Sequence, residues 1–180
     1  VFGADKVHNE EEYDAELRKM IAGQLRLDSN YRFTIDAQAA LEKAVGEIEL
    51  PEEFLKKWLV KTNEKVTAEN VDEEYARMKP AAAWQLIKDV IVEQQGINVA
   101  VDDLLREAKI LAVQQFAQYG MSNVPDEYVD RYAEDFLKND DYRRRLADKA
   151  IDDKIFTAIR ENADVEEKEV SADEFNKLFA

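Results

Sequence analysis

The stretch "GEIELPEEFLKKW" at residues 46–58 shows how this chain is organised. Gly46 ends one helical pattern, and the apolar residues Ile48 and Leu50 then alternate with acidic residues. Pro51 follows, and it is well placed at the first position of a new helix. The stretch therefore predicts two helices joined by a short extended connector.

Similar stretches occur twice more, as "GINVAVDDLLREA" from Gly96 and "SNVPDEYVDRYAEDF" from Ser122. Short connectors of this kind favour helices that fold back on one another as hairpins. The chain has only five glycines and three prolines, which also favours long helices over sheets. We therefore expect an all-α fold, an elongated multi-helix domain whose helical hairpins are attached to one long helix.

The long helix is predicted to begin after Asn9, whose side chain can cap it, and to end at Gly46. Apolar residues recur between these two positions mostly at spacings of three, four or seven. Such a helix has about 35 residues and a length of about 50 Å. It suits a connecting strut better than the interior of a compact domain.

The remaining helices are predicted from their start and stop signals. Pro80 lies inside a helical pattern, where it removes a backbone donor, so we expect a kink there. Asp102 or Asp103 is the expected cap of the helix that follows Gly96. Near the end of the chain, "SADE" at residues 171–174 predicts a capping box.

The charge balance excludes several classes of partner. The formal net charge is -15, and acidic residues outnumber basic ones in residues 1–50, 51–121 and 122–180 alike. A nucleic-acid-binding protein needs a cationic face. The basic run "YRRRLADK" at 142–149 lies among aspartates, and we expect it to pair with them along a helix. Direct binding to nucleic acid or to an anionic membrane is not expected.

The sequence offers little for catalysis. It contains no cysteine, and its single histidine, His8, is expected to be a plain surface residue. No phosphate-binding glycine loop, nucleophile motif or calcium-binding loop is present. No apolar run approaches the length of about 18 residues that a membrane span needs. We expect no catalytic residue, no metal, no cofactor and no membrane insertion.

The apolar side chains are the candidates for function. A chain built from hairpins has too little interior to bury all of them, and exposed apolar patches with charged rims usually mark binding surfaces. The alternative for each residue is packing in the core. We expect eight residues to line an apolar binding surface: Phe54, Trp58, Trp84, Ile87, Ile91, Phe116, Tyr119 and Met121.

Three stretches resemble the C-terminal domain of trigger factor, the ribosome-associated bacterial chaperone. They are "EIELPEEFLKKW", "KDVIVEQQGINVAVDDLLREA" and the ending "NADVEEKEVSADEFNKL". All three occur in the order that the family shows, and the resemblance covers essentially the whole chain. The opening "VFG" is similar to the exit from the family's preceding prolyl isomerase domain.

The resemblance implies one all-helical domain over residues 1–180, with two protruding arms at approximately 51–95 and 122–160. It also implies a cytoplasmic module that holds unfolded or nascent polypeptides without ATP. The ribosome-binding and isomerase domains of the family are absent from this sequence. We therefore expect no isomerase activity, and ribosome contact only through the missing N-terminal domain. Two copies could associate as a homodimer.

Three other functions stay open at this point. The chain could be a similar helical chaperone of the periplasm. It could instead be an adaptor with one defined protein partner, which a narrow choice of clients would reveal. An enzyme with an unrecognised carboxylate site is the third alternative, and it would lose activity on a single Asp or Glu replacement.

Overall fold

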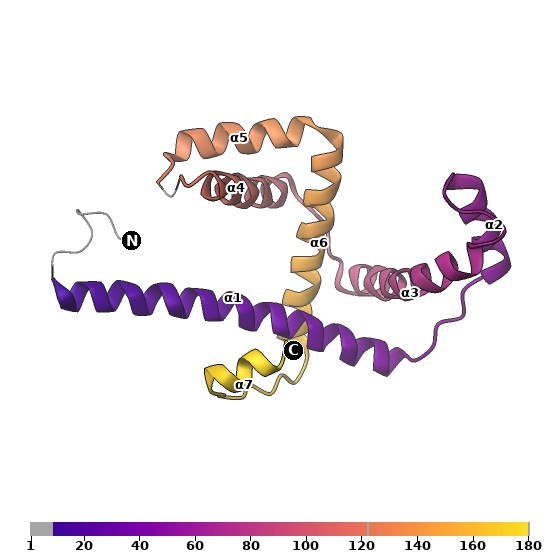
Figure 1. Cartoon of the computed structure of the whole chain (residues 1–180), viewed down its shortest axis with the longest axis horizontal. Helices are drawn as coiled ribbons and strands as arrows, with labels where there is room; N and C mark the ends of the chain where they lie inside the picture. Colours follow the sequence, from indigo (N-terminus) through magenta and orange to yellow (C-terminus); the bar gives the residue numbers. More distant parts are fainter. Residues whose placement is uncertain (1–8, 122, 180) are drawn as a thin grey trace. The chain divides into compact units, whose positions relative to one another are not determined.

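The computed structural model describes residues 9–121 and 123–179, and helices are the regular elements found there. The all-α prediction is confirmed, whereas His8 and the "VFG" opening lie outside the described residues. In chain order the helices are α1 (Glu10–Val45), α2 (Glu52–Thr62), α3 (Val71–Gln95), α4 (Val101–Gln118), α5 (Asp126–Lys138), α6 (Asp140–Asn162) and α7 (Ala172–Lys177) (Figure 1).

Contacts between residues divide the chain into two compact units, Val1–Val90 and Ile91–Ala180. Unit 1 contains α1, α2 and most of α3, and unit 2 contains the end of α3 and the remaining helices. Each unit is described by itself below. The single-domain organisation and the arms at residues 51–95 and 122–160 remain predictions.

The ends of α1 are those that the sequence predicts. The side-chain Oδ1 of Asn9 accepts a hydrogen bond from the backbone N–H of Glu12 at 2.8 Å, which satisfies one free donor of the first turn. At the other end Gly46 has φ +77°, and its N–H donates to the carbonyl of Glu42 at 3.0 Å. A residue with a side chain would be strained in this conformation, so glycine ends the helix here.

Charged side chains join the helices of unit 1. Lys56 on α2 pairs with Glu52 at 2.5 Å and with Asp72 at the start of α3 at 2.7 Å. Its ammonium group also lies over the ring of Tyr75, 5.4 Å from the centroid. The hydrogen bond to Asp72 and then the one to Glu52 raise the pKa of Lys56, so the lysine stays charged and holds α2 to α3.

Pro80 does not interrupt α3, which continues from Val71 to Gln95. The proline has no N–H to donate to the carbonyl of Ala76, so one helical hydrogen bond is missing at this point. The kink expected from the sequence stays a prediction, but Pro80 does not end the helix.

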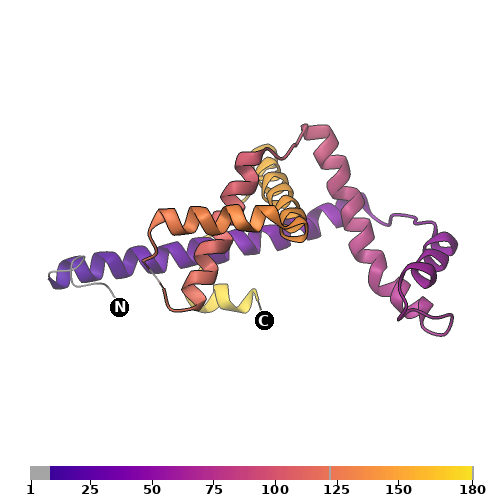
Figure 2. The same ribbon diagram turned by 90° about the horizontal axis from the view of Figure 1, so that it is seen from above.

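The core of unit 2 lies between α4, α5 and α6, which pack on one another. Its buried residues are Ala108, Ala112, Val129, Ala133, Phe136 and Leu146. Three of them are alanines with no exposed surface, and their small side chains allow the helix backbones to come close. Figure 2 shows α5 crossing over α4.

A row of aromatic rings runs through the same three helices. The centroids of Phe116 on α4 and Tyr132 on α5 are 5.2 Å apart, and Tyr132 meets Phe136 edge to face at 5.2 Å. Phe136 in turn lies 4.9 Å from Tyr142 at the start of α6. Pairs at these distances add stability beyond their buried area, so the row links α4, α5 and α6.

The cap of α4 differs from the prediction. The helix begins at Val101 with Ala100 as its N-cap, so neither Asp102 nor Asp103 is the cap residue. Asp103 instead occupies the third helical position, and its Oδ2 accepts a hydrogen bond from the backbone N–H of Ala100 at 2.9 Å. A capping box normally has two side-chain bonds. Alanine has no side-chain acceptor, so only the bond to the Asp103 carboxylate is made here.

Asp103 is also the centre of a polar cluster that fixes the connector before α4. Lys154 on α6 donates to Asp103 Oδ2 at 2.5 Å and to the backbone carbonyl of Asn98 at 2.8 Å. The guanidinium of Arg106 lies 3.3 Å from the other carboxylate oxygen of Asp103. Asp103 is buried, so these partners compensate for the loss of its hydration.

Because of this cluster, we expect the stability of unit 2 to depend on pH. The hydrogen bond from Lys154, followed by that from the Ala100 N–H, lowers the pKa of Asp103 below its ordinary value of 3.8. Its contribution to the stability of unit 2 is therefore complete above pH 3.8 and is lost as the pH falls through the lower folded value. We expect Lys154→Met to lower the urea midpoint of unfolding at pH 5. Below pH 4, the midpoint of this variant should decrease less steeply with falling pH than the midpoint of the parent chain.

Lys149→Met is the matched control, because Lys149 pairs with Asp153 on the exposed surface of the same helix. It should leave both the midpoint and its pH dependence close to those of the parent chain. Equal midpoints and equal pH profiles for the two lysine variants would show that the cluster around Asp103 does not stabilise unit 2.

The capping box predicted for the last helix is confirmed. The N–H of Ser171 donates to the Glu174 carboxylate at 2.9 Å, and Ser171 Oγ accepts from the N–H of Glu174 at 3.3 Å. The rings of Phe175 and Phe179 then meet at 5.3 Å. These local contacts favour the short helix α7.

Candidate functional site

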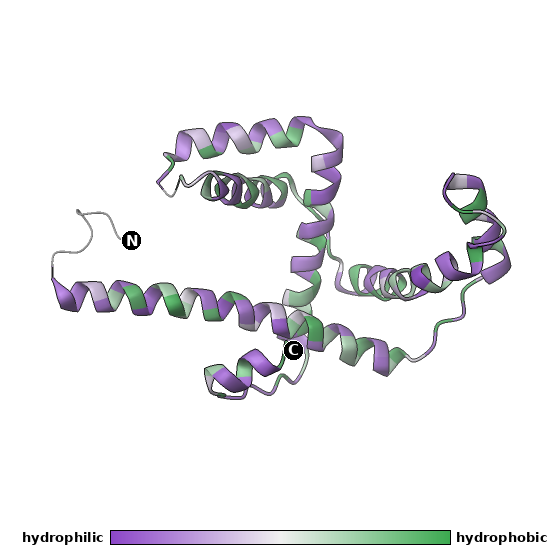
Figure 3. Cartoon of the chain, in the orientation of Figure 1, coloured by the Kyte–Doolittle hydropathy of each residue, from purple (hydrophilic) through white to green (hydrophobic). Residues whose placement is uncertain are grey.

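The eight predicted surface residues lie on three parts of the chain. Phe54 and Trp58 belong to α2, and Trp84, Ile87 and Ile91 belong to α3. Phe116, Tyr119 and Met121 lie at the end of α4 and just beyond it. Figure 3 shows hydrophobic and hydrophilic residues interleaved along these helices.

On α2 the apolar residues divide into two rows. Leu55 and Leu59 are half-buried, whereas Phe54 and Trp58 are 64% and 48% exposed. Each row has a spacing of four residues, which places its two members on one face of the helix. The Phe54 and Trp58 side chains thus form a small aromatic face that is open to a partner.

The predicted residues of α3 are less accessible. Ile87 is buried, and Trp84 and Ile91 are half-buried, while Leu86 and Val90 between them are exposed. A buried side chain contributes to packing, so Ile87 does not fit an exposed binding surface in this structure. Trp84 and Ile91 are half-buried, so only part of each side-chain surface is accessible to a binding partner.

Beyond the end of α4, apolar side chains surround a shallow hollow of about 420 Å3. It is lined by Phe116, Met121, Asn123, Val124, Pro125 and Tyr128. Two predicted residues, Phe116 and Met121, thus come together at one site. Tyr119 is not part of the lining, but at 76% exposed it is open to solvent close by in the chain.

The backbone at the end of α4 brings Met121 back towards Phe116. Gly120 has φ +77°, and its N–H donates to the carbonyl of Ala117 at 3.0 Å. The N–H of Met121 then donates to the carbonyl of Phe116 at 2.9 Å. These two bonds make a Schellman motif, whose usual apolar contact joins the same two positions as Met121 and Phe116 here.

The sequence interpretation did not assign Val124, Pro125 and Tyr128 to the site. The signal that could have revealed them is the stretch "NVPDEY" at 123–128, which begins two residues after Met121. Pro125 is the N-cap of α5, and α5 packs on α4. The connector between the two helices therefore stays close to the end of α4. An apolar connector in that position adds to the apolar surface at the end of the helix.

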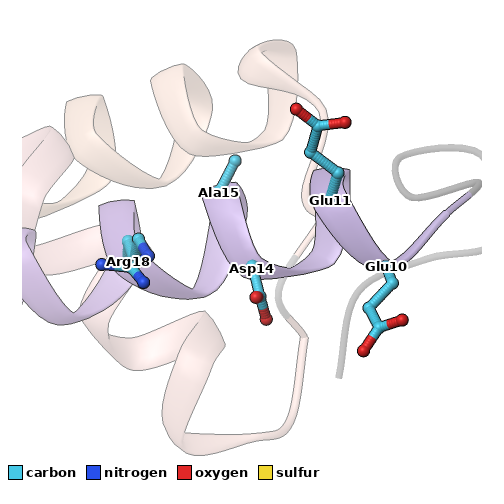
Figure 4. Close-up of a pocket in the computed structure, with 5 residues that line it drawn as sticks. All are labelled: Glu10, Glu11, Asp14, Ala15 and Arg18. Atoms are coloured by element: carbon cyan, nitrogen blue, oxygen red, sulfur yellow. The ribbon is translucent and has the colours of Figure 1, made fainter.

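The first turns of α1 line a second hollow, of about 560 Å3, and most of the residues around it are charged. Its residues are Glu10, Glu11, Asp14, Ala15 and Arg18, all on a single helix. Figure 4 shows that the carboxylate of Glu11 points to the opposite side from those of Glu10 and Asp14. Because these groups do not converge on one point, the hollow offers no constellation for catalysis or ligand binding.

Two basic residues of the run on α6 pair with aspartates as predicted. Arg143 lies 2.6 Å from Asp140, and Lys149 pairs with Asp153, each within one helical turn. Within residues 9–121 and 123–179 no group of three or more His, Asp or Glu side chains is placed to hold a metal ion. None of the helices in that part of the chain combines the length and apolar composition that a membrane span needs.

Comparison with known proteins gives one match. The family model described as "Probable trigger factor, C-terminal domain" matches residues 29–179, which include most of α1 and all of the later helices. No curated protein and no solved structure matches the chain. The match covers the three stretches that carry the resemblance, though not the opening "VFG", and chaperone-type function belongs to this domain of trigger factor. The chain therefore belongs to the trigger factor C-terminal domain family.

Proposed function

We propose that this chain is an ATP-independent holdase, which binds apolar segments of unfolded or nascent polypeptides and so prevents their aggregation. The family supplies the chaperone class. The observation that carries the finer proposal is the exposure of apolar side chains in two places, on α2 and around the hollow beyond α4.

Each place offers a modest contact. Burying one side chain the size of Phe or Met contributes about 1.5–3 kcal/mol, so neither face alone would bind a client tightly. Several such contacts on one flexible client raise the overall affinity, because the second contact forms within an already bound chain. This mode of binding needs exposed apolar residues on the client and no particular sequence.

The surroundings of these faces support a soluble, broadly acting protein. The net charge of -15 opposes self-aggregation through the apolar faces. The resemblance assigns ribosome docking and proline isomerisation to other domains of the family, so we propose neither for these residues. A cytoplasmic location stays an expectation from the resemblance, and the sequence does not give the oligomeric state.

The test is light scattering as a denatured client is diluted into the full chain without ATP, with two unrelated clients. Phe54→Ser with Trp58→Ser removes one face, and Tyr119→Ser with Met121→Ser reduces the other. Each double variant should need about tenfold more chaperone for the same suppression, since 1.4 kcal/mol corresponds to a tenfold change in affinity.

Val165→Ser with Val170→Ser is the control, because these valines are also exposed but lie outside both faces. It should suppress aggregation as well as the parent chain, and circular dichroism should show unchanged helix content in every variant. Suppression of one client only would favour the adaptor alternative. Absence of suppression at several molar equivalents would contradict the holdase function of this chain.

A further inference from the structure

Methionine is the only sulfur-containing residue of this sequence. There is no cysteine, and the three methionines are Met20, Met78 and Met121. A peroxide converts the thioether of an accessible methionine into a sulfoxide, and sulfoxide reductases reverse the change. Because the sulfoxide is polar, the effect of this reaction depends on what the methionine contacts or binds.

Met121 is both accessible and part of an apolar site. Its side chain is 54% exposed, and it lines the hollow beyond α4. Met20 on α1 is similarly exposed, at 50%, but it belongs neither to the α2 face nor to the hollow. Met78 on α3 is half-buried. An accessible sulfur and a proposed client contact therefore coincide at Met121.

We propose that Met121 is an oxidation site, and that its sulfoxide weakens the holding of clients at the hollow beyond α4. The proposal rests on the holdase function proposed above and adds a means of regulating it. The oxidant is a peroxide such as hydrogen peroxide.

The reaction needs no other group of the protein. The sulfur lone pair of Met121 forms a bond to one peroxide oxygen while the O–O bond breaks. The proton on the transferred oxygen passes to the leaving hydroxide, which departs as water. The sulfur loses two electrons and the peroxide gains them, so the products are the sulfoxide and water.

The surroundings of Met121 make this change unfavourable for client binding. Apart from Asn123, the lining of the hollow is apolar or aromatic. The N–H of Met121 donates to the carbonyl of Phe116 at 2.9 Å, which fixes position 121 beside the hollow. An apolar client side chain that enters would remove water from the sulfoxide oxygen and offer no hydrogen bond in return, which costs free energy.

Two variants of the full chain separate Met121 from the other methionines. Met20→Leu with Met78→Leu retains Met121, and Met121→Leu retains the other two. Leucine and methionine have similar volumes, so both variants should keep the fold. After treatment with hydrogen peroxide, mass spectrometry of peptides should show one added oxygen on Met121 in the first variant and on Met20 in the second.

Light scattering with two unrelated denatured clients then compares each variant before and after the peroxide. The variant that retains Met121 should need about three- to tenfold more protein for the same suppression once it is oxidised. Methionine sulfoxide reductases should restore its original activity. Met121→Leu should hold clients equally well before and after the treatment, although Met20 is oxidised in it.

The outcomes distinguish this inference from the holdase proposal. Suppression that does not change when Met121 is oxidised, or an equal effect of peroxide on Met121→Leu, would overturn the inference alone. So would a loss of helix content on oxidation, because the protein would then fail through unfolding. If the untreated parent chain suppressed no aggregation, the holdase proposal would fail, and this inference would fail with it.

Discussion

Replacing Phe136 with alanine should lower the free energy of unfolding of unit 2 by about 3–5 kcal/mol. Phe136 is buried between α4, α5 and α6, and its ring contacts both Tyr132 and Tyr142. The substitution leaves a cavity at this junction and also removes two aromatic pairs. Urea unfolding followed by circular dichroism measures the loss.

Tyr119→Ala is the control for this substitution. It also removes an aromatic ring, but Tyr119 is largely exposed at the end of α4, so its effect should stay within about 0.5 kcal/mol. If both variants unfolded at the same urea concentration, the junction of the three helices would not be the stabilising core of unit 2.

The second large effect is expected from Ala133→Leu. Ala133 on α5 has no exposed surface and lies in the buried cluster with Ala108 and Ala112 of α4. A leucine there has no space between the helices, so α5 must move away from α4 or distort. We expect a loss of about 1–3 kcal/mol in the free energy of unfolding, or more if the helices separate.

Ala117→Leu makes the same chemical change at an exposed alanine of α4 and should be nearly neutral in urea unfolding. The movement of α5 predicts a second, independent signal for Ala133→Leu. Because Val124 and Pro125 lead into α5 and line the hollow beyond α4, this variant should also hold clients less well. Full stability with unchanged client holding would show that the helices do not approach closely at Ala133.

Helix ends were predictable because local residues determine them. Asn9 and Ser171 bond to backbone groups three residues away, and Gly46 needs only its own φ of +77°. The start of α4 was predicted less well, since two adjacent aspartates could each act as cap. Neither of them is the cap: Ala100 is, and Asp103 at the third helical position also bonds to Lys154 on α6, a contact between distant residues that the local sequence does not show.

Burial could not be predicted in the same way. Phe54 and Ile87 both occur in apolar helical patterns, yet the first is exposed and the second is buried. The difference depends on which segments cover each residue, and periodicity contains no information on that. For the same reason the sequence identified Phe116 and Met121 as candidates but did not assign Tyr128 to the hollow they share.

The bond between Lys154 and Asp103 has a consequence for the newly made protein itself. Lys154 follows Asp103 by 51 residues. The bond at the start of α4 therefore cannot form until these residues, which are most of unit 2, have been translated. At about 5–20 residues per second this delay is about 3–10 s. During that time the apolar sides of α4 and α5 have no α6 to cover them. On the proposed holdase function, such a nascent copy would itself be a client for a finished one.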